Sequence, residues 1–333
     1  MPSEEPLTIV VAGAGAVGST LGGFLAARGH RVTLVGRDPH MATVARDGLR
    51  VTGIFVPAHS RPDARTDLSS ADAPCDLALV TVKSHATATI GESLARWRNR
   101  PAWTVSLQNG IGNVELLSSM LGGERVLGGR VIFGATIEQP GTAHVTVSAA
   151  PVAIGPLDDA SSAQHAAAGQ FARVLTESGV VAEAVPDIAP VLWEKLLYNC
   201  GLNPLGAIHG LTYGEVARSP ELRVTLDAAM DEGFRVARAS GVALPWSDAA
   251  AYRAHFHARL LPPTAAHRSS MRQDLEAGRR TEVEAINGAI VRAGARAGVP
   301  TPVHSRLVAA VHEAERDSRA KGRGGTFAPR PGR

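Results

Sequence analysis

Cysteine is scarce in this chain of 333 residues, which contains only two. Cys75 and Cys200 lie far apart, and neither has a further cysteine beside it at the spacing of metal ligands. The sequence therefore indicates neither a disulfide framework nor a zinc site, and we expect no metal. So few cysteines suit a reducing compartment, and we expect a cytoplasmic protein.

A strong excess of charge of either sign is also missing, since the formal net charge is +3. So small an excess does not predict a nucleic-acid partner. Part of it lies in residues 319–333, which are basic and rich in glycine and proline. We expect this segment to be a disordered tail.

A convincing membrane segment is lacking as well. The uncharged run Leu7–Ala27 contains five glycines and follows Glu4 and Glu5 rather than basic residues. It predicts neither a signal peptide nor a transmembrane helix, so no membrane partner is expected. The length is sufficient for two domains that each bury a core of their own.

The N-terminal part has the pattern of a dinucleotide-binding unit. A strand-like run, Leu7–Val11, leads into the sequence AGAGAVG, a helical pattern continues to Gly29, and a second strand is expected over His30–Val35. The G-x-G-x-x-G spacing in such a unit permits a tight turn, close approach of a pyrophosphate and close packing of the helix on the strand. The residues expected to contact the cofactor are Gly13, Ala14, Gly15, Ala16, Val17 and Gly18.

The end of the second strand indicates which dinucleotide is bound. An acidic residue there would hold the ribose 2′-hydroxyl of NAD or FAD, but the chain has Gly36 and Arg37 at this point. Arg37 can pair with a 2′-phosphate, which favours NADPH. Asp38 follows directly, so a strand that ends one residue later would favour NAD instead.

Two further strands are expected within Asp76–His85 and Trp103–Asn113, which places Lys83 and Asn109 at strand ends where ligands bind in parallel sheets. A surface lysine and a turn asparagine are the alternatives. The strand-like segments Arg130–Ile137 and Ala143–Gly155 are expected to extend the same sheet. We therefore predict a Rossmann-type domain over residues 1–187.

Residues 188–318 have helical periodicity and predict a mostly α-helical second domain. Lys195, Asn199 and Asn203 follow one another at intervals of four in an apolar segment, so they form one polar stripe on a helix. Pro204 is expected to kink or end this helix. A solvated lysine with two surface asparagines is the alternative interpretation.

A later segment reads SSMRQDLEAGRRTEVEAINGAIV. Ser269 and Ser270 indicate a helix start and Gly278 a helix end, while Thr281 and Glu284 have the spacing of a capping box. Glu282 would then lie in the first turn of the next helix, where an acidic residue can simply complement the helix dipole.

Together the blocks AGAGAVG, VTVKS, QNGIGN, WEKLLYNCGLNPLGAI and SSMRQDLEAGRRTEVEAINGAIV resemble the ketopantoate reductase family, NADPH-dependent enzymes of pantothenate synthesis, from about Leu7 to Glu315. The resemblance implies reduction of 2-dehydropantoate to pantoate, in a cleft between the two domains. The roles it implies are the catalytic lysine for Lys195, a catalytic or substrate-binding carboxylate for Glu282, contact with the substrate hydroxyl for Asn199 and Asn203, contact with the substrate carboxylate for Ser270, and cofactor-side or cleft positions for Asn109 and Lys83.

One position departs from the family pattern. Tyr213 stands where the family has a further substrate asparagine, and a phenol cannot offer both the donor and the acceptor of an amide. A related reductase of another 2-oxo acid therefore remains an alternative, as does a non-catalytic NADP-sensing regulator. Both a monomer and a homodimer are compatible with the sequence.

Overall fold

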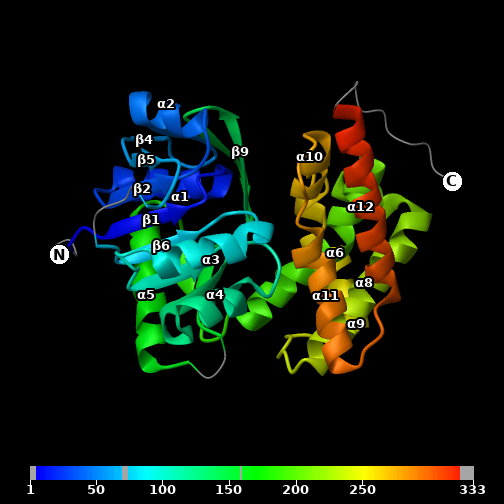
Figure 1. Cartoon of the computed structure of the whole chain (residues 1–333). Coiled ribbons are helices and arrows are strands. Elements are labelled where there is room, and N and C mark those ends of the chain that lie inside the picture. The colour runs from blue at the N-terminus through cyan, green and yellow to red at the C-terminus, as the bar shows by residue number, and fades with distance from the viewer. Residues whose placement is uncertain (1–4, 70–73, 158–159, 323–333) are drawn as a thin grey trace. The chain divides into compact units, whose positions relative to one another are not determined.

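The computed structural model describes residues 5–69, 74–157 and 160–322. Two compact units are present: one combines Met1–Gln108 with Gly112–Val191, and the other combines Asn109–Ile111 with Leu192–Arg333. The structure thus divides the chain four residues after the expected boundary at residue 187, and it assigns the short segment Asn109–Ile111 to the second unit. Figure 1 shows the β-strands in the N-terminal unit and the long helices of the C-terminal unit.

Among the described residues of unit 1, eight strands form a sheet in which most neighbours are parallel. In the order in which they pair, the strands are β12 (Ala182–Ala184), β11 (Val152–Gly155), β8 (Val126–Arg130), β7 (Trp103–Ser106), β6 (Leu77–Val80), β1 (Thr8–Ala12), β2 (Arg31–Val35) and β5 (Asp63–Arg65). Every residue of β1 is buried, as expected for a strand that has neighbours on both edges and helices or strands over its faces. The predicted α/β fold with a Rossmann-type sheet is confirmed.

The prediction that Arg130–Ile137 and Ala143–Gly155 extend one sheet is wrong in part. β9 (Phe133–Gln139) and β10 (Thr142–Ser148) form an antiparallel hairpin that pairs with β3 (Leu49–Gly53) and β4 (Ala58–Ser60) in a second sheet. Val145 of this hairpin is fully buried, and the helix α1 (Ala16–Ala27) contacts strands of both sheets. Burial against α1 therefore places the hairpin in the second sheet, which the alternating pattern of the segment could not indicate.

The remaining helices of unit 1 pack in pairs. α1 contacts α5 (Ser162–Glu177), and α3 (Thr87–Arg96) contacts α4 (Asn113–Leu121). The helix α2 (His40–Asp47) packs beside β5. The same unit contains two short 3-10 helices, η1 (Ser84–Ala86) and η2 (Gly123–Arg125).

The described residues of unit 2 form helices joined by loops, without β-strands. α11 (Val283–Ala297) and α12 (Pro302–Gly322) lie side by side, and α8 (Pro220–Ala239) packs against both (Figure 1). The other elements are α6 (Ala189–His209, with Leu192 onward in this unit), α7 (Tyr213–Arg218), α9 (Ala249–His255), the π-helix η3 (Phe256–Leu260), the 3-10 helix η4 (Pro262–Thr264) and α10 (Ser270–Glu276). α12 continues four residues into the expected tail, whose residues 323–333 lie outside the described part of the chain.

Pro204 does not end α6, which continues to His209. Proline has no N–H, so it cannot donate to the carbonyl of Cys200 one turn earlier. Asn287 of α11 supplies the missing donor, with its Nδ2 2.7 Å from the Cys200 oxygen. A side chain from another helix thus satisfies the carbonyl, and the backbone remains helical.

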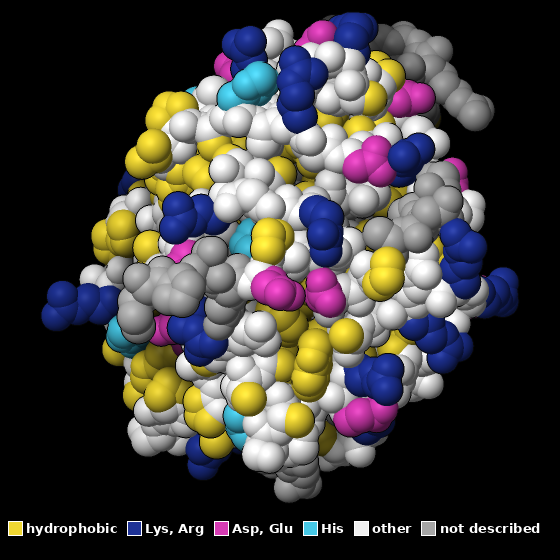
Figure 2. All heavy atoms as spheres, turned by 90° about the vertical axis from the view of Figure 1, so that its left-hand side faces the viewer, with side chains coloured by type: hydrophobic (Ala, Val, Ile, Leu, Met, Phe, Trp, Pro, Cys, Tyr) yellow, Lys and Arg dark blue, Asp and Glu magenta, His cyan; other side chains and the backbone are white. Residues whose placement is uncertain are grey.

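One face of the molecule is drawn with its side chains coloured by type in Figure 2. On the face shown in Figure 2, lysine and arginine side chains lie scattered among uncharged ones rather than along one stripe. Within the described residues, every helix is either too short or too polar to span a bilayer. In the same residues, no cluster of three or more histidine, cysteine, aspartate or glutamate side chains has the arrangement of a metal site.

Candidate active site

The glycine loop lies at the point where the strand order of the sheet changes direction. β1 pairs with β2 on one side and with β6 on the other, and the loop follows the carboxyl end of β1. Gly13 has φ +120°, and a Cβ atom there would lie 2.4 Å from the nitrogen of Val82. A side chain at Gly18 would lie 2.3 Å from the carbonyl oxygen of Gly13. Both positions therefore require glycine for a close approach of backbone segments.

Gly15 has the opposite environment. A Cβ atom built on this residue would meet no protein atom within 4 Å, and Gly15 caps the N-terminus of α1 without a side-chain hydrogen bond. The space beside Gly15 at the N-terminus of α1 is therefore open, as the approach of a pyrophosphate requires. Ala14, Ala16 and Val17 belong to the same turn and first helical residues. The residues present thus fit the diphosphate of a dinucleotide.

Arg37 and Asp38 are both exposed just after β2. Oδ1 of Asp38 accepts a hydrogen bond of 3.0 Å from the backbone N–H of Ala42 in α2. The carboxylate of Asp38 is therefore used in part to hold the start of α2. Arg37 has the exposed guanidinium that a 2′-phosphate would need.

Lys83 and Gln108 follow β6 and β7. Lys83 is half-buried and immediately precedes η1. The buried Gln108 donates to the carbonyl oxygen of Val82 at 3.1 Å and to the hydroxyl of Thr87 at 2.7 Å. Gln108 thus ties the ends of the two strands together.

Asn109 joins the two predicted catalytic side chains. Its Oδ1 accepts a hydrogen bond of 2.8 Å from Nζ of Lys195, and its Nδ2 donates one of 3.2 Å to Oε2 of Glu282. The segment that carries Asn109 is held on α11, since the N–H of Ile111 bonds to the carbonyl oxygen of Ala285 at 3.3 Å. Unit 2 therefore contains a cluster of an ammonium, an amide and a carboxylate, which we call the Lys195–Asn109–Glu282 cluster.

Glu282 has a different local position from the one expected. It is the N-cap residue of α11 and only 6% exposed, and the predicted capping box of Thr281 and Glu284 is wrong. Thr281 instead donates both its N–H and its hydroxyl to Oε1 of Glu315 in α12, each at 2.7 Å. Burial opposes the charge on Glu315, but these hydrogen bonds keep its pKa below the ordinary value. A buried carboxylate thus holds the backbone just before Glu282.

The two asparagines of the α6 stripe differ in their surroundings. Asn199 is half-buried, and its side chain makes no hydrogen bond to the described residues. Asn203 is 3% exposed, and its Oδ1 accepts a hydrogen bond of 2.6 Å from the hydroxyl of Tyr213. The residue that departs from the family pattern therefore contacts one of the predicted substrate residues directly.

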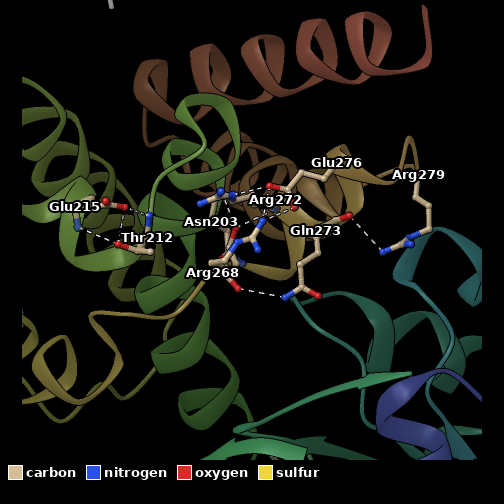
Figure 3. Close-up of polar contacts among 9 residues, drawn as sticks. Asn203, Thr212, Glu215, Arg268, Arg272, Gln273, Glu276 and Arg279 are labelled. Carbon is tan, nitrogen blue, oxygen red and sulfur yellow. Dashed lines mark hydrogen bonds and ion pairs between the residues drawn. The ribbon is translucent and has the colours of Figure 1, made fainter. Parts of the chain in front are cut away.

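Ser270 is the first residue of α10, and its neighbour Ser269 is the N-cap, as predicted. The Ser269 hydroxyl accepts from the N–H of Arg272 at 3.0 Å and donates to the backbone oxygen of Asn203 at 3.4 Å. Figure 3 shows Arg268 and Arg272 directed at Glu276 near this point. Both guanidinium groups contact one oxygen of that carboxylate, at 2.6 and 2.8 Å. α10 also ends where predicted, because Gly278 has φ +64°.

Sequence reasoning did not identify Asn287, Glu315 or the contact between Tyr213 and Asn203. Pro204 could have indicated a residue such as Asn287, because a proline inside a helix leaves a carbonyl that needs another donor. The sequence offers no comparable signal for Glu315, which lies 34 residues from Thr281.

Two family models match the chain. The one described as ketopantoate reductase PanE/ApbA matches residues 9–159, and the one described as ketopantoate reductase PanE/ApbA C terminal matches residues 187–315. Among individual relatives, the 2-dehydropantoate 2-reductase of Archaeoglobus fulgidus is 35% identical over 308 residues, which cover 92% of this chain and 97% of that protein. The enzyme of the same name from Aquifex aeolicus is 32% identical over 310 residues, covering 93% and 97% of the two chains.

Solved structures show the same relationship. A PanE/ApbA family ketopantoate reductase from Ralstonia eutropha has a TM-score of 0.82 at 32% identity, with 93% of this chain and 99% of that one covered. A D-mandelate dehydrogenase, solved with NADH and anilino(oxo)acetate, also has a TM-score of 0.82, at 27% identity and the same coverage. Because the two family models together cover most of both units, the chain belongs to the ketopantoate reductase family.

Proposed function

We propose that this protein reduces the keto group of 2-dehydropantoate to the alcohol of pantoate with NADPH, a step of pantothenate biosynthesis. The observation that carries the proposal is the similarity to 2-dehydropantoate 2-reductases, which are 32% and 35% identical and are matched over nearly their whole length. The Lys195–Asn109–Glu282 cluster supplies side chains suited to this chemistry.

Bound NADPH supplies the hydride for the carbonyl carbon of the substrate. Negative charge then develops on the carbonyl oxygen, and the Lys195 ammonium stabilises this charge and delivers the proton. The hydrogen bond from Nζ to Oδ1 of Asn109 orients the ammonium of Lys195. Glu282, bonded to the other end of the same amide, fixes the orientation of Asn109 and, through it, of Lys195.

The remaining predicted residues bind the substrate. Ser270, at the first position of α10, holds the substrate carboxylate, and the dipole of the helix end favours that charge. Asn199 and Asn203 contact the substrate hydroxyl. A buried amide left without a partner costs about 1–3 kcal/mol, so these residues disfavour a substrate that lacks this oxygen.

Apart from Asn109, which belongs to unit 2, the proposed cofactor residues lie in unit 1. The loop Gly13–Gly18 holds the pyrophosphate, with Gly15 leaving space for it. Arg37 pairs with the 2′-phosphate, which is supported by its exposure and by the bond that occupies an oxygen of Asp38. Lys83 follows β6 at the same edge of the sheet and contributes positive charge.

A reductase of another 2-oxo acid is the second candidate, and Tyr213 is the observation that favours it. The similar D-mandelate dehydrogenase, solved with anilino(oxo)acetate and NADH, shows that this fold accommodates an aryl ligand and the unphosphorylated cofactor. A panel of 2-oxo acids assayed with NADPH and with NADH separates the candidates. We expect the highest kcat/KM with 2-dehydropantoate and NADPH; absent turnover of that acid, with good turnover of an aryl 2-oxo acid, would contradict the pantothenate assignment.

We also propose that residues 1–187 act as the cofactor domain and residues 188–318 as the catalytic domain, in a cytoplasmic protein that is a monomer or a homodimer. Both cysteines are buried free thiols, in keeping with a reducing compartment. Light scattering on the purified protein measures the oligomeric state, and a mass of more than two chains would contradict this proposal.

A further inference from the structure

The amide of Asn203 has one side occupied. Oδ1 accepts the hydrogen bond from the Tyr213 hydroxyl at 2.6 Å, and the backbone oxygen of the same residue accepts from Ser269 at 3.4 Å. These contacts come from α7 and from the N-cap of α10. Ser269 therefore holds the backbone of Asn203, and Tyr213 holds its side-chain oxygen.

Tyr213 cannot easily release this bond. Only 4% of the residue is exposed, and its ring makes edge contacts with Tyr198 and His267 at centroid distances of 5.7 and 5.1 Å. Its backbone N–H also bonds to the carbonyl oxygen of His267 at 3.1 Å. Burial raises the pKa of the Tyr213 phenol above its ordinary value, so the hydroxyl keeps its proton at neutral pH and remains a donor.

The other end of the amide is available. Nδ2 of Asn203 donates no hydrogen bond to the described part of the chain. The residue is nevertheless almost completely buried, with 3% of it exposed. Nδ2 is not fully enclosed by the described residues. It therefore reaches an accessible space, where a donor without a protein partner requires water or a ligand.

We propose that Tyr213 makes Asn203 a donor-only group, so that this site selects 2-oxo acids by an oxygen that accepts a hydrogen bond rather than by a hydroxyl proton. The inference rests on the proposed function, in which Asn203 contacts the substrate. An asparagine with a free Oδ1 could accept from a hydroxyl or, after rotation, donate to it. The bond from Tyr213 directs Oδ1 toward the α7 side chain, so Nδ2 is the atom of the amide that remains for a ligand.

The preferred substrate class follows from this restriction. In 2-dehydropantoate, the carbon that carries the hydroxyl is attached to the quaternary carbon with its two methyl groups. A hydroxyl, an ether or a carbonyl oxygen at this position can each accept a hydrogen bond from Nδ2 of Asn203. A substrate with hydrogen there cannot, and it leaves a nearly buried N–H group unpaired. The site therefore discriminates strongly against loss of this oxygen and weakly against its methylation.

The unmodified protein gives the first test. NADPH oxidation is measured with 2-dehydropantoate, with its O-methyl ether and with 3,3-dimethyl-2-oxobutanoate, which lacks the oxygen. We expect the deoxy acid to lose about tenfold or more in kcat/KM, and the ether to lose less than the deoxy acid. An ether that is no better than the deoxy acid would overturn the inference while leaving the proposed function intact, because 2-dehydropantoate would still be reduced.

Tyr213→Phe gives the second test, since it removes only the hydroxyl. The freed Oδ1 can then accept the proton of the substrate hydroxyl, and the preference for 2-dehydropantoate over its ether should rise about three- to tenfold. This preference is a ratio within one enzyme, so a general loss of activity through structural damage does not change it. An unchanged ratio in Tyr213→Phe would overturn the inference.

Tyr252→Phe is the matched control. Tyr252 is fully buried in the same unit, and its hydroxyl has no recorded partner among the described residues. We expect the substrate ratio of this variant to equal that of the unmodified protein. An equal rise in both variants would assign the effect to loss of any buried phenol and would contradict a specific role for Tyr213. If the unmodified protein reduces none of the three acids, the proposed function fails first and the inference fails with it.

Discussion

Nζ of Lys195 lies 2.8 Å from Oδ1 of Asn109, although 86 residues separate the two in the chain. Asn109 follows a strand of unit 1 in sequence, yet it belongs to unit 2 by its contacts. The other end of its amide contacts Glu282. The turn after β7 therefore orients a lysine of the helical unit, which the proposed function assigns to proton transfer.

Lys195→Ala should lower kcat by about 100-fold or more, because it removes the proposed donor of the proton to the carbonyl oxygen. Lys195→Arg keeps the charge but has a guanidinium that releases protons poorly, so it should recover only a small part of the rate. Initial rates of NADPH oxidation measure both variants. Near-normal turnover in the alanine variant would refute the proton-donor role.

Asn109→Ala should lower kcat by about tenfold, since it removes both the acceptor for Lys195 and the donor for Glu282. Asn113→Ala is a useful comparison, because Oδ1 of that buried amide accepts from Thr87 within unit 1 at 2.8 Å. We expect the second variant to melt at a lower temperature while keeping most of its kcat. Equal effects of the two substitutions on kcat would contradict the bridging role of Asn109.

Arg37→Ala should reduce kcat/KM for NADPH by about 10- to 100-fold, the scale of a charge-assisted bond to phosphate, and change kcat/KM for NADH much less. Arg50→Ala, on an exposed position of β3, removes an equal charge elsewhere on unit 1. It should leave the ratio of the two cofactors unaltered. A parallel loss with NADPH and NADH in Arg37→Ala would show that Arg37 does not read the 2′-phosphate.

Acid should destabilise the protein in part through His304, which is fully buried in α12. Burial lowers the pKa of His304 from its ordinary value of 6.5 to about 4. Between pH 6.5 and pH 4, His304 is therefore protonated more readily in the unfolded chain than in the folded chain. The stability that depends on the neutral ring is complete above pH 6.5 and is lost as the pH falls toward 4.

The difference of about 2.5 pKa units corresponds to about 3 kcal/mol of unfolding free energy, at about 1.36 kcal/mol per unit. His304→Gln should be less stable at neutral pH, because Nε2 of the histidine bonds to the Ala229 oxygen at 2.9 Å. Its stability should, however, depend less on pH between 6.5 and 4. Urea unfolding at a series of pH values measures both quantities, and identical slopes in the two proteins would contradict the assignment.

Pro204 and Asn287 should be coupled through the carbonyl of Cys200. Asn287→Leu leaves this buried oxygen without its donor and should cost about 1–3 kcal/mol of unfolding free energy. In the double variant with Pro204→Ala, the restored N–H of residue 204 can bond to the same oxygen, so part of the loss should be recovered. Urea unfolding of both single variants and the double variant gives the coupling energy. Strictly additive effects would contradict the proposed exchange of donors.

Local pattern was enough to predict much of this protein. The glycine spacing, the apolar strand before it and the helix after it predicted the dinucleotide loop, because a pyrophosphate needs glycine at particular positions of one short segment. Ser269 and Gly278 predicted both ends of α10 for the same reason: a cap acts on residues within a few positions of itself. The intervals of four between Lys195, Asn199 and Asn203 likewise placed them on one helix.

Contacts between distant segments were decided only by the tertiary structure. The hairpin of β9 and β10 joins the second sheet because α1 covers it there, and Glu282 is an N-cap because Glu315 of α12 takes both donors of Thr281. Tyr213 looked in the sequence like the loss of a substrate amide, whereas in the fold it occupies the acceptor of the neighbouring amide, Asn203. The residue pattern specifies which donors and acceptors each segment carries, but packing of whole helices and strands determines which of them meet.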